Sequence, residues 1–328
     1  MADGLRAAAV FVETAAVHDM TRNSPSAQSG REPVRQSSVG VIAADWLLAA
    51  IPPPAASSWQ LSEIVHNFRT ASKRARALVQ LFAEVLGKQT RHHEDFRLRD
   101  TARALAGARD ASVARALLRR LKRTHRGRMA AAIASALRGL ADKADVALAS
   151  KETRAAIARA NAALHATVRQ FRRLDLTPRD ASDAIESGLR LSYRRSRHEM
   201  RRARASGAAA RFHEWRKLIK RLFYQLQFPG LAESKVGRQL VRRLDELQER
   251  LGLEHDTQLV IALLRAKPAR FGGAKPTARV IAALESRSRK LRARCLRLGA
   301  KTFTDKPAVF GKDIRHRLRR LRARINPA

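Results

Sequence analysis

Apolar residues recur at spacings of three and four along most of this chain. From Trp59 onward the sequence is rich in Ala, Leu and Arg, shows almost no alternation of β-branched residues, and has Pro and Gly only at intervals. This period is that of α-helices with one buried face. The pattern predicts an all-α fold, with helices over residues 60–86, 94–106, 110–124, 127–140, 142–174, 179–206, 209–228, 233–251, 255–266, 276–299 and 306–325.

The first 58 residues differ in character. Residues 19–38 are polar and lack an apolar period, and the segment IPPPAASS at 51–58 would break a helix. We therefore expect an N-terminal extension over 1–58, disordered or partly helical, followed by a helical domain at 59–325.

The sequence favours a cytoplasmic protein. No apolar run reaches the ~18 to 20 residues that a membrane span needs, and the N-terminus, which carries acids and lacks a basic lead, is a poor secretory signal. The single cysteine, Cys295, permits no internal disulfide, which fits a reducing compartment. We expect Cys295 to be a small core residue.

Positive charge dominates the composition. The chain has 67 Lys and Arg against 29 Asp and Glu, a net charge of +38. Such an excess cannot be neutralised within the surface, so a polyanionic partner is expected: nucleic acid, an anionic membrane or a phosphate polymer. The low aromatic content, 5%, argues weakly against single-stranded nucleic acid, whose bases usually stack on aromatic side chains, but not against a duplex.

Two segments of the chain are similar to each other. VHNFRTASKRARALVQLF begins at Val65 and FHEWRKLIKRLFYQLQF at Phe212, and their alignment pairs His66 with His213. Further on, GARDASVARALL aligns with GLEHDTQLVIALL at nearly the same spacing, pairing Asp110 with Asp256. This order predicts a duplicated helical unit, with repeat 1 at about 59–175 and repeat 2 at about 176–325.

Both histidine helices are expected to carry one cationic and one apolar face. Two further helices carry cationic rows, through Arg190, Arg194, Arg197, Arg201 and Arg204 and through Arg287, Lys290, Arg294, Arg297 and Lys301. Solvated faces normally intersperse Glu, and these rows have almost none, so anion binding is the better explanation. For His66 and His213, a hydrogen bond to phosphate and a packing role both remain open.

Catalytic signatures are absent from the sequence. It has no GxxxxGK[ST] loop and no HExxH motif. The run RHHED at 91–95 offers conceivable metal ligands, but its neighbours would point to different sides of a helix, so a loop or helix start is favoured. We expect no catalytic residue, no metal and no cofactor.

The two histidine segments, each followed by the Gly…Asp…Leu-Leu segment, resemble the CHAD family, the conserved histidine α-helical domain, over roughly 59–325. The resemblance implies two pseudo-symmetric antiparallel helical bundles around a basic central cavity that binds inorganic polyphosphate. Many relatives carry a triphosphate tunnel domain with an ExExK motif; this chain has none, so that activity does not carry over. The motif positions and the rows together give the candidate polyphosphate-binding residues: His66, Arg69, Lys73, Arg74, Arg76, Arg190, Arg194, Arg197, Arg201, His213, Arg216, Lys217, Lys220, Arg221, Arg294 and Lys301.

One departure and two rival functions remain. The helix before the second histidine helix is long, whereas its counterpart before His66 is interrupted by PPP; either VGVIAADWLLAAI at 39–51 is a shortened version or the first bundle is incomplete. The rivals are a nucleic-acid-binding protein and a phosphate-processing enzyme. The enzyme would need an acid cluster, yet the matched acids Asp110 and Asp256 resemble helix N-caps. A scaffold on polyphosphate granules is compatible with polyphosphate binding.

Overall fold

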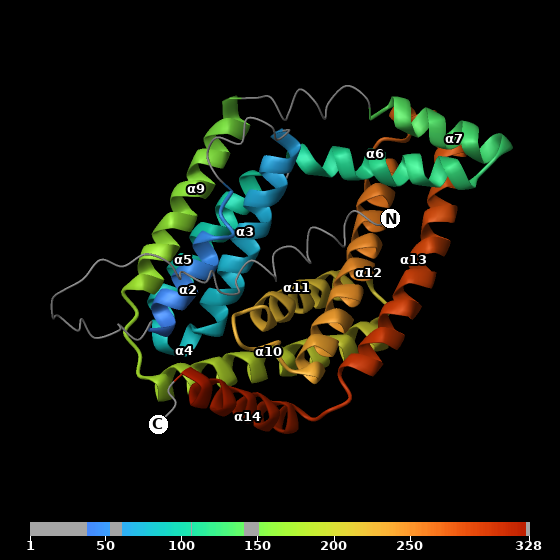
Figure 1. Ribbon diagram of the computed structural model, residues 1–328. Coiled ribbons are helices and arrows are strands. Elements are labelled where there is room, and N and C mark those ends of the chain that lie inside the picture. The colour runs from blue at the N-terminus through green and yellow to red at the C-terminus, as the bar shows by residue number, and fades with distance from the viewer. Residues whose placement is uncertain (1–37, 53–60, 106, 141–150, 326–328) are drawn as a thin grey trace, which may run out of the picture. The chain divides into compact units, whose positions relative to one another are not determined.

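The described chain is helical, and the all-α prediction is confirmed. The structure, a computed structural model, describes residues 38–52, 61–105, 107–140 and 151–325, and no strand occurs among them (Figure 1). The helices are α2 Val39–Leu48, α3 Leu61–Leu81, α4 Ala83–Leu86, α5 Lys88–Ala104, α6 Gly107–Thr124, α7 Gly127–Arg138, α9 Lys151–Arg172, α10 Pro178–Ser206, α11 Ala209–Leu226, α12 Lys235–Ala266, the 3-10 helix η1 Pro268–Phe271, α13 Ala274–Thr302 and α14 Pro307–Ile325.

Local sequence sets several helix ends. The Thr177 hydroxyl accepts a hydrogen bond from the backbone N–H of Asp180, and Pro178 follows in the first turn of α10. Gly207 ends α10 with a φ of 63°, a left-handed conformation that glycine adopts without steric cost. The predicted and observed bounds of α10 therefore agree closely.

Two predicted boundaries are wrong. The helices expected at 233–251 and 255–266 are one helix, α12, so Asp256 lies inside it and is not an N-cap; Asp110 likewise lies inside α6. α12 passes through Gly252 because it packs along its length on α11 and α13, and this contact outweighs the weak helix propensity of a single glycine. The RHHED run belongs to α5, which begins at Lys88, and is neither a loop nor a helix start.

The apolar faces of the histidine helices are buried as predicted. Phe68, Ala75, Val79 and Phe82 of the first copy are at most 3% exposed, and Trp215, Leu222 and Leu226 of the second are at most 1% exposed. Cys295 is also buried, and burial raises the pKa of its thiol to about 12.

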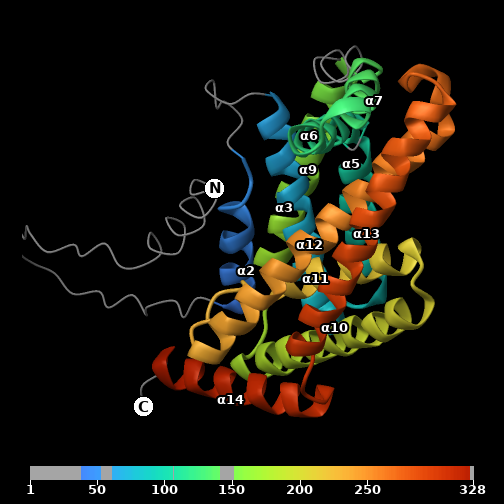
Figure 2. The ribbon, with the colours of Figure 1, turned by 90° about the vertical axis from the view of Figure 1, so that its right-hand side faces the viewer.

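The core consists of two apolar clusters. The larger one joins α2, α3, α5, α9, α10, α11 and α14 with the first half of α12 and the end of α13. The smaller one joins α6 and α7 with the second half of α12, η1 and the first half of α13. α6 and α7 precede residue 175, so helices of the expected first repeat share a core with helices of the expected second repeat. The long helices α12 and α13 run side by side and contribute to both clusters (Figures 1 and 2).

α2 occupies the place before the first histidine helix. It packs chiefly against α9, and Ala43, Ala44 and Leu47 are fully buried. A Cβ at Gly40 would lie 2.3 Å from the carbonyl oxygen of Leu174, so only glycine permits this approach. α10 similarly packs against α14 and, unlike the short α2, also extensively against α11 (Figure 2). Part of the expected extension is thus a core helix, which fits the shortened version; the polar segment 19–37 and residues 53–58 lie outside the described residues.

Candidate polyanion-binding site

The cationic face of the first histidine helix, α3, is turned partly toward α5. Arg69 donates from Nη1 to the carbonyl oxygen of Ala102 at 3.2 Å, and Arg76 donates to both carboxylate oxygens of Asp95 at 3.0 and 3.3 Å. Lys73 is half-buried on the same helix, and His66 is exposed. The cationic residues thus lie on one face of α3, but two of its arginines donate hydrogen bonds to acceptors on α5.

The second histidine helix, α11, faces α12 and brings two histidines together. Nδ1 of His213 lies 3.0 Å from Nδ1 of His255, and the ring centroids are 4.4 Å apart. In this hydrogen bond one Nδ1 carries the hydrogen and donates, and the other Nδ1 has no hydrogen and accepts. His255 was missed by the sequence analysis because it has no histidine partner in the repeat: the aligned position holds Arg109.

Burial and neighbouring cations disfavour the protonated form of both histidines by lowering their pKa values. Burial, together with the neighbouring Arg216, His213 and Lys220, lowers the pKa of His255 to about 3. The pKa of His213 is lowered by burial and then by Lys217 and Arg216, against the opposing effect of Glu214. The contact between α11 and α12 therefore brings together four of the predicted residues: His213 and the cations that lower the pKa values of the pair, Arg216, Lys217 and Lys220.

A second concentration of charge lies among α3, α5, α10 and α11. We call Arg76, Arg91, Arg195 and Arg221 the arginine cluster. Burial lowers the pKa of Arg221; Asp95 opposes this shift, whereas Arg76, Arg195 and Arg91 add to it. Arg76 and Arg221 were predicted; Arg91 and Arg195 were missed because they lie outside the repeated motif and the counted rows.

Arg74, which the repeat aligns with Arg221, lies in different surroundings. Its guanidinium is 5.9 Å from the ring centroid of Trp46 on α2. Burial lowers the pKa of Arg74, and Tyr224 opposes the shift. Arg74 therefore packs against an aromatic ring in place of joining the arginine cluster.

The predicted row on α10 spreads over several surroundings. The side chain of Arg190 lies against α14, since a Cβ at Gly311 would be 3.0 Å from its Cδ. Arg197 lies near Tyr193 and lowers the pKa of its hydroxyl, against the larger opposite effect of burial. The Tyr193 hydroxyl donates a hydrogen bond to the carbonyl oxygen of Asp305 at 3.2 Å. Arg194 lines a cavity of about 340 Å³ with Arg195, His198, Glu199 and Leu218, and Arg201 is exposed.

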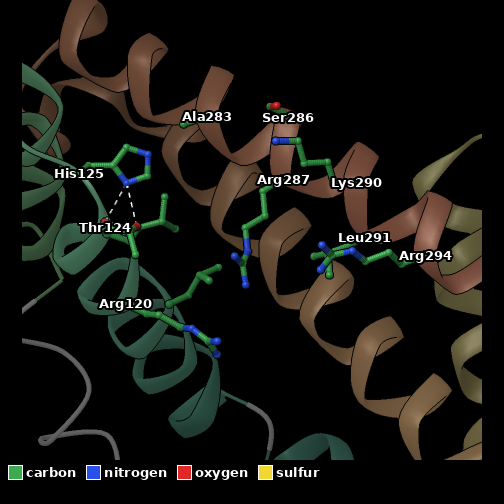
Figure 3. Close-up of a pocket in the computed structure, with 11 residues that line it drawn as sticks. Arg120, Thr124, His125, Ala283, Ser286, Arg287, Lys290, Leu291 and Arg294 are labelled. Atoms are coloured by element: carbon green, nitrogen blue, oxygen red, sulfur yellow. Dashed lines mark hydrogen bonds between the residues drawn. The ribbon is translucent and has the colours of Figure 1, made fainter.

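The row on α13 contributes to a larger pocket. A cavity of about 500 Å³ lies between α6 and α13, and Figure 3 shows Arg120 of α6 and Arg287 of α13 pointing toward one another across it. Arg294 also lines this pocket, whereas Lys301 is exposed two turns farther along α13. Arg120 was not predicted as a binding residue, because it belongs to neither of the cationic rows and to neither histidine helix.

Acidic side chains near these clusters are held by arginines. Buried Glu94 accepts from Arg97 at 2.6 Å and from Thr167 at 2.7 Å, and buried Glu254 accepts from Arg292 at 2.7 Å. Within RHHED, the two histidines are exposed while Glu94 and Asp95 bind arginines. In the part of the chain that the structure describes, no group of three or more His, Cys, Asp or Glu side chains could hold a metal ion.

No helix among the described residues combines the length and the hydropathy that a bilayer-spanning helix needs. Comparisons of the chain with curated proteins and with solved structures gave no match. A family model, described as the CHAD domain, matches residues 54–265, which include both histidine helices and all of the arginine cluster. The chain therefore belongs to the CHAD domain family.

Proposed function

We propose that this protein binds inorganic polyphosphate without catalysing a reaction on it. CHAD domains are associated with polyphosphate binding in general. The observation that carries the proposal is the arginine cluster: three guanidiniums lower the pKa of the half-buried Arg221, and among the described residues only the carboxylate of Asp95 raises it. An arrangement that is electrostatically unfavourable alone is stabilised when an anion binds.

The chemistry of the cluster suits a phosphate chain. Each guanidinium can grip two phosphate oxygens in parallel, and each lysine nearby adds a point charge. A flexible polymer with about one negative charge per unit could pass from the arginine cluster to the cationic residues beside His213 without any base to recognise. The histidine pair is neutral in the free protein, and an approaching phosphate would favour its protonation.

The state of the acids supports binding over catalysis. Asp95, Glu94 and Glu254 are each engaged by an arginine, so none is placed as a separate metal ligand or general base. We expect no phosphate release when the protein is incubated with long-chain polyphosphate and divalent cations; orthophosphate appearing in proportion to enzyme concentration would contradict this.

The first test is a competition titration. Labelled long-chain polyphosphate bound to the full chain is challenged with duplex DNA, RNA and heparin at matched charge and about physiological salt. Polyphosphate should survive a large excess of the other polyanions. If all compete alike, the net charge attracts any polyanion and a nucleic-acid partner becomes the better proposal.

Matched variants locate the binding surface. Arg221→Ala removes the centre of the arginine cluster, whereas Arg238→Ala removes an equal charge from an exposed position at the start of α12. The first should weaken polyphosphate binding and the second should not. Binding of this kind would also carry the protein to polyphosphate granules, where a fluorescent fusion should co-localise with a polyphosphate stain and the Arg221→Ala fusion should do so less.

A further inference from the structure

We propose that the pocket between α6 and α13 is a separate site for a short linear oligophosphate, of about the size and charge of triphosphate. The inference rests on the proposed function for the choice of phosphate as ligand, but it concerns different residues. Four cationic side chains line this pocket: Arg120 from α6, and Arg287, Lys290 and Arg294 from α13. None of the four pairs with a carboxylate among the residues that the structure describes.

Arg287 lies at the centre of this charge. Burial lowers its pKa, and Arg120 and Arg294 lower it further. A phosphate group between Arg120 and Arg287 would accept hydrogen bonds from guanidinium N–H groups that face the pocket and would supply the missing negative charge (Figure 3).

The pocket is built on a packed base. Leu117 and Leu121 of α6 and Leu291 of α13 line it and are at most 7% exposed. Both α6 and α13 pack against α12, which fixes their positions relative to one another. Buried side chains of α6 and of the first half of α13 belong to the smaller of the two apolar clusters. The cationic side chains are therefore presented from helices rather than from loops, which favours a defined site.

The dimensions favour a short ligand. A volume of about 500 Å³ lies within the roughly 300 to 1,000 Å³ typical of small-molecule pockets. Four cations match the roughly four negative charges of a triphosphate at neutral pH. The same chemistry is offered by a free oligophosphate and by the end of a long chain.

The family motif does not account for this pocket. α13 begins at Ala274, beyond the match at residues 54–265, and it supplies three of the four cations. Arg120 lies within the match but outside both histidine helices. Binding here is thus separable by mutation from binding at the arginine cluster.

The test is calorimetric titration of the full chain with tripolyphosphate at about physiological salt. Arg287→Gln with Arg294→Gln should weaken binding at least about tenfold, the usual effect of losing charge-assisted hydrogen bonds. The matched control is Arg279→Gln with Arg289→Gln, which removes the same charge from exposed positions of the same helix outside the pocket, and should stay within about twofold of wild type. Circular dichroism and Tm check folding; should the pocket pair misfold, Lys290→Gln alone, at an exposed position, should still weaken binding.

Two results would overturn the proposal: a pocket pair that binds tripolyphosphate as wild type does, or a control pair that loses as much. Long-chain polyphosphate at equal chain concentration separates the two sources of the ligand. A weaker long-chain affinity in the pocket pair supports capture of chain ends, and an unchanged one supports a free oligophosphate. Failure of the proposed function is detected by different measurements. DNA would displace long-chain polyphosphate from the wild type as well as polyphosphate itself does, and Arg221→Ala would bind polyphosphate with wild-type affinity.

Discussion

The two histidine helices have similar sequences and different surroundings. In α3, His66 is exposed, and Arg76 forms an ion pair with Asp95 of α5. In α11, His213 is half-buried and contacts His255 of α12, among cations that lower its pKa. Each helix buries the apolar face that its period predicts. The apolar face thus follows from the sequence of each helix. The helix that packs beside it determines which groups surround the charged residues.

The buried faces give the largest expected effect. Phe68 and Trp215 occupy matched positions, and Trp215 is fully buried, with its ring 2.7 Å from where a Cβ on Gly299 would lie. Trp215→Ala should lower the free energy of unfolding by about 3 to 5 kcal/mol, and Phe68→Ala by an amount at the lower end of that range. Urea denaturation followed by circular dichroism measures both. A Phe68→Ala loss clearly exceeding that of Trp215→Ala would show that α3, not α11, anchors the core.

Sequence reasoning was strongest where one helix decides the outcome. The all-α class, the buried faces of α3 and α11 and the bounds of α10 follow from period and capping, which are local. The helix break expected near Gly252 is absent, because the packing of α12 on α11 and α13 outweighs the low helix propensity of this glycine. His255, Arg91 and Arg195 were missed because their importance arises only when separate helices meet.

The charged faces differ as well, and a matched pair of arginines tests this. Arg221→Ala should weaken polyphosphate binding by about 1.5 to 3 kcal/mol, since it removes charge-assisted hydrogen bonds from the arginine cluster. Arg74→Ala should weaken binding less, because Arg74 lies over Trp46, and its main cost should be about 0.5 to 1 kcal/mol of stability from the lost cation–π contact. Fluorescence titration gives the affinities. Equal losses in binding would mean that both arginines contact the ligand alike.

The histidine contact adds a pH dependence to α11. The pKa values of His213 and His255 are lowered in the folded state, so below about pH 6.5 the unfolded chain binds more protons than the folded one. This contribution to stability is complete above that pH and is lost as the pH falls toward the folded-state value of about 3 for His255. His255→Gln should therefore flatten the decline in stability between pH 7 and pH 4.

Urea midpoints at several pH values measure that decline. His66→Gln is the matched control, and because His66 is exposed it should keep the wild-type slope. A His255→Gln slope equal to that of wild type would mean that the histidine pair is not a source of the acid sensitivity.

The smallest effect comes from exchanging one residue between the two helices. Lys217 lies beside Glu214 at 2.6 Å with about half of each side chain exposed, and the repeat aligns Lys217 with Thr70 of α3. Lys217→Thr should change the free energy of unfolding by less than about 0.5 kcal/mol, because exposed ion pairs contribute little. It should raise the pKa of His213, which Lys217 lowers, and reduce the slope of polyphosphate affinity against salt by about one if Lys217 contacts a phosphate. The reciprocal change, Thr70→Lys, adds the charge to α3 and should leave the pKa of His213 unaltered. NMR titration of the imidazole resonances measures the pKa of His213. If this pKa is unchanged in Lys217→Thr, burial and Arg216 are the causes of its lowered value. Because Arg216 is matched by Arg69 in α3, the difference between the two helices would then lie in their packing.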